Sequence, residues 1–176
     1  MARRVYFSFH YEADVWRANE VRNSWVSKPD RESAGYYDAA EFEEVKRQGD
    51  GAIERWIDRN LEGTTVTAIL VGENTCERRW VNYEIRRSLD KGNGLVFIKI
   101  HNLRDRNGGT CREGAMDFDG LDVRGYPVYD WVNDDGYNKL GDWVETCALA
   151  ANRPKLGPPP QRYTSRSSCG RPCNRS

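Results

Sequence analysis

The amino-acid sequence predicts a three-layer α/β domain built on a central parallel sheet of five strands. Two apolar runs favour this fold, TVTAILV at residues 65–71 and LVFIKI at residues 95–100. Both are nearly continuous, which is typical of strands buried on both faces of a parallel sheet. Strand-like and helix-like segments also alternate along the chain, the order from which parallel sheets are built. The 176 residues suffice for one domain with a full core.

The part of the chain before these runs is predicted to hold two strands and a helix. Residues 3–9, RRVYFSF, are rich in strand-forming residues and give the first strand. Residues 13–25 give a helix, because apolar residues recur there at helical spacing: Val15, Ala18, Val21 and Trp25. A short second strand is predicted at 35–38. We expect Asp38 to cap the following segment, 39–45, rather than to contact a ligand.

Three further helices and a last strand complete the predicted fold. A helix over 50–62 has one apolar face, formed by Ile53, Trp56, Ile57 and Leu61. A helix over 77–90 separates the two buried strands. A short fifth strand is predicted at 126–129. The closing helix, 138–151, turns four side chains inward: Leu140, Trp143, Val144 and Cys147.

The distribution of charge divides the chain into two parts. The formal net charge is zero, with 27 basic and 27 acidic residues, which argues against a nucleic-acid binder based on bulk charge. Residues 152–176 nevertheless carry six basic residues, no acidic ones and five of the seven prolines. Such a composition cannot bury enough apolar surface to fold. The sequence therefore predicts a folded domain at 1–151 and a disordered basic tail at 152–176, which either contacts an acidic partner or RNA or is solvated without a role.

Membrane, secreted and zinc-binding proteins are disfavoured by composition. Mean hydropathy is −0.83, and no apolar run approaches the roughly 18 residues of a membrane span. The first residues, MARRVYFSFHYEAD, lack the apolar core of a secretory signal, so we expect a cytoplasmic protein with reduced thiols. No metal site is expected, because C-x-x-C is absent and the candidate ligands are scattered: Cys76, Cys111, Cys147, Cys169, Cys173, His10 and His101.

Ligands of parallel sheets bind outside the carboxyl ends of the strands. Those ends carry Ser8–Tyr11, Asp38, Gly72–Asn74 and His101. The turn after the first strand, SFHYEAD, has no glycine, which excludes a dinucleotide-binding G-x-G-x-x-G motif. A P-loop and the G-x-S-x-G turn of hydrolases are absent as well. The third strand is followed by Gly-Glu, where a receiver domain would need an aspartate.

One combination of motifs remains. Trp80 and Glu84 are four residues apart and so share one face of the predicted helix. Four stretches, RRVYFSFHY, VTAILVGENT, RRWVNYEIRRSLDKGNG and VYDWVNDDGYNKLGDWV, follow one another from the first strand to the last helix. In this order they closely resemble the TIR-like domains of bacterial Thoeris anti-phage defence systems. The basic tail lies outside the resemblance.

The resemblance implies a flavodoxin-like fold and an enzyme that consumes NAD⁺ without any further cofactor. TIR domains of this kind cleave the bond between nicotinamide and ribose. In Thoeris systems the ADP-ribose part becomes a cyclic ADP-ribose-type messenger that activates a separate effector protein after phage infection. By this analogy Glu84 takes the position of the catalytic glutamate. A non-catalytic TIR-like module that senses a phage component or acts by self-association is the alternative.

Seven residues around Glu84 are expected to bind the substrate: Tyr6, Ser8, Phe9, His10, Tyr11, Trp80 and Tyr83. The aromatic ones could stack on nicotinamide or adenine. Structural roles compete with this interpretation: Trp80 could pack in the core, Ser8 could be a small residue at a crowded strand end, and His10 could bond the next loop. His101 is expected to be structural.

Overall fold

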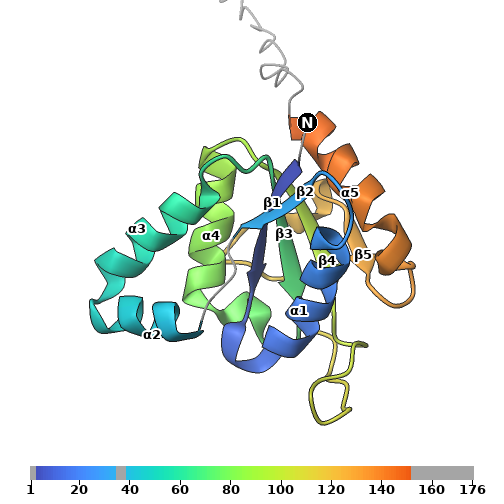
Figure 1. Cartoon of the computed structure of the whole chain (residues 1–176), viewed down its shortest axis with the longest axis horizontal. Coiled ribbons are helices and arrows are strands. Elements are labelled where there is room, and N and C mark those ends of the chain that lie inside the picture. The colour runs from blue at the N-terminus through green and yellow to red at the C-terminus, as the bar shows by residue number, and fades with distance from the viewer. Residues whose placement is uncertain (1–2, 35–38, 152–176) are drawn as a thin grey trace, which may run out of the picture.

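The computed structural model describes residues 3–34 and 39–151, and it confirms the predicted α/β fold. Five parallel strands form one sheet in the order β2-β1-β3-β4-β5. Helices α1 (Tyr11–Val26) and α5 (Gly136–Ala151) contact each other on one side of the sheet. Helix α4 (Arg79–Asp90) packs on the other side, covered in turn by α3 (Asp50–Leu61) and α2 (Ala39–Arg47), which gives the three layers visible in Figure 1.

The centre of the sheet consists of the two strands that the apolar runs predict. Strand β3 (Val66–Val71) is buried at every position and pairs with β1 (Arg3–Phe9) and β4 (Gly94–Lys99). Its side chains alternate between two cores: Ala68 and Leu70 join one cluster, Ile69 and Val71 the other. Burial on both faces explains why its sequence is continuously apolar.

The two edge strands of the sheet are β2 and β5. The second strand, β2, is Arg31–Ala34, and the predicted segment 35–38, with Asp38, lies outside the described residues. The sequence of β2, RESA, is polar, so periodicity gave no signal for a strand that pairs only with β1. The fifth strand, β5 (Val128–Asp130), begins two residues later than predicted.

The helices begin and end close to their predicted limits. Helices α1 and α5 each begin two residues earlier than predicted, whereas α4 begins two residues later, at Arg79, because Thr75–Glu77 form a separate 3-10 turn, η1. Helix α5 ends at Ala151 as predicted, and the predicted basic tail at 152–176 lies outside the described residues. In the described part of the chain, no helix is long and apolar enough to cross a membrane.

The carboxyl edge of the sheet is held together by a buried ion pair. Arg17 of α1 contacts the Asp14 carboxylate at 3.1 Å, and both side chains are almost fully buried. The same guanidinium donates to the carbonyl oxygens of Leu103 and Gly109, at 2.9 and 3.1 Å. Burial raises the pKa of Asp14 despite the opposing charge of Arg17. This contact fixes the loop after β4 against the helix that follows β1.

Candidate active site

Glu84 is the centre of the site. It lies on the face of α4 that packs against β1 and β3, and its side chain is fully buried. Tyr6 Oη donates a hydrogen bond to Glu84 Oε1 at 2.7 Å. Ser8 Oγ donates to Oε2 at 2.5 Å. Tyr6 and Ser8 are two residues apart on β1, so both side chains point to the same face of the sheet.

This arrangement suits an ionised carboxylate. A buried charge is costly unless it is hydrogen-bonded, and hydrogen bonds to the charged form favour it. Each oxygen of Glu84 receives a hydroxyl donor from a fully buried side chain of β1. The two bonds also fix the direction in which the carboxyl group points.

A chain of buried polar groups holds the helix that carries Glu84. Ser88 Oγ donates to the Glu84 carbonyl oxygen at 2.7 Å and lies 2.7 Å from Thr67 Oγ1 of β3. Asn93, in the turn after α4, donates to Thr64 Oγ1 at 2.9 Å and to Thr67 Oγ1 at 3.3 Å. Because these groups satisfy one another, they lock the rotation of α4 over β3.

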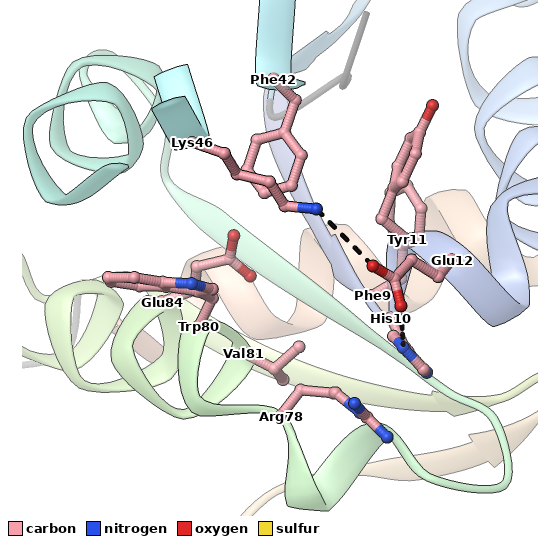
Figure 2. Close-up of a pocket in the computed structure, with 10 residues that line it drawn as sticks. All are labelled: Phe9, His10, Tyr11, Glu12, Phe42, Lys46, Arg78, Trp80, Val81 and Glu84. Atoms are coloured by element: carbon pink, nitrogen blue, oxygen red, sulfur yellow. Dashed lines mark ion pairs between the residues drawn. The ribbon is translucent and has the colours of Figure 1, made fainter. Parts of the chain in front are cut away.

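A pocket of about 160 Å³ opens next to the carboxylate (Figure 2). This volume is below the roughly 300–1,000 Å³ that encloses a drug-sized ligand, so only one end of a dinucleotide would fit inside. The pocket draws its walls from β1, α1, α2 and α4, and its lining residues are Phe9, His10, Tyr11, Glu12, Phe42, Lys46, Arg78, Trp80, Val81 and Glu84.

Aromatic rings form much of the pocket wall. Tyr11 lies between Phe9 and Phe42, with ring centroids 6.3 and 6.0 Å apart. On the side of α4, Trp80 is half-buried and meets Tyr83 edge-on at 5.9 Å. Such surfaces can stack on a flat heterocycle such as nicotinamide.

Charged and titratable side chains line one side of the pocket and contact one another. Glu12 Oε1 lies 3.6 Å from Lys46 Nζ, and Glu12 Oε2 lies 3.9 Å from His10 Nε2, as the dashed lines in Figure 2 mark. Burial lowers the pKa of Lys46, but Glu43 and Glu12 outweigh it, so the pKa lies above its usual value. Burial, followed by the charge of Arg78, lowers the pKa of His10. At neutral pH the pocket therefore carries a charged lysine and a neutral histidine.

The structure brings together most of the residues that were expected around Glu84. Phe9, His10, Tyr11 and Trp80 line the pocket. Tyr6 and Ser8 lie behind the carboxylate, where both are fully buried and bind Glu84 itself.

Two residues considered in the sequence analysis, Tyr83 and His101, lie outside the pocket. The hydroxyl of Tyr83 lies 3.5 Å from Asp58 Oδ1. Tyr83 instead lines a separate charged hollow over the outer face of α4. His101, expected to be structural, lies 3.9 Å from Asp130 at the far side of the sheet edge.

Five lining residues escaped the sequence analysis: Glu12, Phe42, Lys46, Arg78 and Val81. Phe42 and Lys46 come from α2, a short polar helix, where a lone aromatic residue was the only signal. Arg78 directly precedes α4 at the carboxyl edge of the sheet, and this position could have marked it as a candidate for the site. Among the described residues, no group of three or more histidine, cysteine or acidic side chains could hold a metal ion.

Comparison with known proteins agrees with the resemblance noted above. A family model described as "Thoeris protein ThsB, TIR-like domain" matches residues 6–105. A protein of Bacillus cereus (strain MSX-D12), named "Putative cyclic ADP-D-ribose synthase ThsB1", is 36% identical over 191 residues, which cover 82% of this chain and 100% of that protein. The matched range includes the second half of β1, with Tyr6 and Ser8, and all of β3 and α4. The chain belongs to the family of TIR-like domains represented by the Thoeris protein ThsB.

Proposed function

We propose that this protein cleaves the nicotinamide–ribose bond of NAD⁺ and converts the ADP-ribose part into a cyclic ADP-ribose-type messenger. The observation that carries the proposal is the buried Glu84 carboxylate, held by Tyr6 and Ser8 next to an aromatic pocket. The name of the Bacillus cereus relative, "Putative cyclic ADP-D-ribose synthase ThsB1", supports the choice of reaction.

The chemistry requires one well-placed carboxylate. The nicotinamide ring is cationic in NAD⁺, so it leaves as a neutral base with the electron pair of the C–N bond and needs no general acid. The ribose is left as an oxocarbenium ion, as in glycoside hydrolysis. The Glu84 carboxylate can stabilise this positive charge and hold the ribose hydroxyls in a pocket that excludes much of the water.

A second nucleophile then completes the reaction. Attack by water gives ADP-ribose, whereas attack by a ring nitrogen or hydroxyl of the same molecule gives a cycle; in either case a proton is released. Phe9, Tyr11, Phe42 and Trp80 favour the cycle by keeping water from the ribose.

The messenger would act on a separate Thoeris effector protein in the cytoplasm after a phage-derived trigger, with self-association as a route to activation. A test uses cells that express the wild type, Glu84→Gln, or the control Glu20→Gln, each with and without phage. Glu20 is an exposed glutamate of α1 outside the pocket. Filtered lysates are analysed by mass spectrometry for nucleotides derived from ADP-ribose.

A species with the mass of cyclic ADP-ribose, present with the wild type and Glu20→Gln and absent with Glu84→Gln, is the expected result. Cells that resist the phage with unchanged NAD⁺ and no new nucleotide would refute it. That outcome would favour a TIR-like module that senses or self-associates without turnover.

A further inference from the structure

Arg78 differs from the other basic groups of the pocket. Lys46 is paired with Glu12 and Glu43. Arg78 forms no ion pair with any carboxylate in the described part of the chain. Its Nε atom is buried and, among those same residues, has no hydrogen-bond partner. The side chain is half-buried and lines the pocket that contains Glu84.

Among the described residues, Arg31 also has a buried guanidinium nitrogen without a hydrogen-bond partner, but its guanidinium lies over the Trp25 ring at 4.6 Å, outside the pocket. Acidic residues outnumber basic ones by 27 to 21 in residues 1–151, so carboxylate partners are plentiful. Arginines of the adjoining helix α4 have them: Arg86 pairs with Asp119 and Arg87 with Asp58. Withdrawing a cation from water without a partner is costly. An anionic ligand that binds at Arg78 would offset this cost.

The spacing of Arg78 and Glu84 fits the two ends of a ribose phosphate. Arg78 directly precedes α4 and Glu84 is the sixth residue of that helix, so their backbones are separated by roughly 8 Å along the helix axis. Figure 2 shows Arg78 on the opposite side of the pocket from Lys46, beside His10. A ribose carries its anomeric carbon at one end and its 5′ phosphate at the other. With the anomeric carbon at Glu84, the phosphate would lie toward Arg78.

We propose that Arg78 binds the diphosphate of the ADP-ribose unit and thereby places the ribose bond against Glu84. Guanidinium groups bind phosphate through two parallel hydrogen bonds, which orient the ligand as well as hold it. His10 is neutral at neutral pH and adds no charge to this subsite. The identity of the ligand rests on the proposed function, but the subsite itself requires no bond cleavage.

The test measures binding to the purified full chain by isothermal titration calorimetry. Two probes are compared: ADP-ribose, which has the diphosphate, and nicotinamide riboside, which has no phosphate. The variants are Arg78→Gln, Arg78→Lys and the control Arg86→Gln. Arg86 lies on α4 and lines the outer hollow rather than the pocket. Thermal unfolding of each variant shows that the fold is intact.

Arg78→Gln should weaken ADP-ribose binding about tenfold or more, as expected for the loss of charge-assisted hydrogen bonds. Nicotinamide riboside should bind as before, Arg78→Lys should be intermediate, and Arg86→Gln should change neither affinity. Equal weakening of both probes, an unchanged affinity for ADP-ribose, or a wild type that binds ADP-ribose no more tightly than nicotinamide riboside would each overturn the proposal. If the wild type showed no NAD⁺ turnover, the proposed function would be refuted. The binding of ADP-ribose at Arg78 would not be affected by that result.

Discussion

Removal of one oxygen atom tests the arrangement around Glu84. In Tyr6→Phe the ring stays in the core, where Tyr6 is fully buried, and only the hydroxyl that donates to Glu84 Oε1 is lost. No large cavity forms, so the change in stability reports mainly on this hydrogen bond. A hydrogen bond to a charged group contributes about 1.5–3 kcal/mol. We expect the free energy of unfolding to fall by about 2 kcal/mol, a shift in melting temperature of roughly 4–8 °C.

The charge of Glu84 can be separated from its shape by a double-mutant cycle. In the Glu84→Gln background the same hydroxyl bonds a neutral amide, which contributes only about 0.5–1.5 kcal/mol. The cost of Tyr6→Phe should therefore shrink by about 1 kcal/mol in that background. Urea unfolding at neutral pH, followed by circular dichroism, measures all four proteins. A difference below about 0.5 kcal/mol, the scatter of independent sites, would refute an ionised carboxylate held by Tyr6.

Three further changes test the surroundings of the site. Gly114→Ala would place its Cβ against the carbonyl oxygen of Gly72, so the free energy of unfolding in urea should fall by about 1–3 kcal/mol. The control Gly109→Ala should cost little, because its Cβ would lie 3.7 Å from the nearest atom. Equal effects of the two substitutions would contradict the packing of this loop. Arg17→Met leaves Asp14 buried without its partner and should cost about 3–5 kcal/mol; a loss below about 1 kcal/mol would show that the ion pair is unimportant. Since burial and then Arg78 lower the pKa of His10 below 6.5, stability should fall as the pH drops through 6.5, and unfolding curves of His10→Gln should show a smaller fall; an identical slope would contradict this.

The sequence predicted the layers of the fold because burial leaves a strong pattern. Strands β3 and β4 are apolar at nearly every position, and the helices show regular apolar faces. Strand β2 was not predicted at Arg31–Ala34, because its formation depends on contacts that lie outside its own sequence. Trp25 Nε1 donates to the Glu32 carbonyl oxygen, and the Arg31 guanidinium lies 4.6 Å from the Trp25 ring. Such contacts form only after α1 has packed beside β1.

The candidate site was predicted in its centre and missed at its rim. The Trp80–Glu84 spacing placed both residues on one helix face, since helical geometry is local. The contacts of Glu84 with Tyr6 and Ser8 join residues more than 70 positions apart, so their role as carboxylate ligands followed only from the fold. Arg78 became a candidate only when its burial and missing partner could be seen.

The central claim is that the Glu84 carboxylate acts on the nicotinamide–ribose bond. The most direct measurement adds NAD⁺ labelled in both the nicotinamide and the ADP-ribose parts to extracts of infected cells that express the wild type or Glu84→Gln. Mass spectrometry then quantifies labelled nicotinamide and labelled ADP-ribose products together. We expect equal amounts of both with the wild type, including a species with the mass of cyclic ADP-ribose, and neither above background with Glu84→Gln. Nicotinamide release that persists at the wild-type rate in Glu84→Gln would contradict that claim.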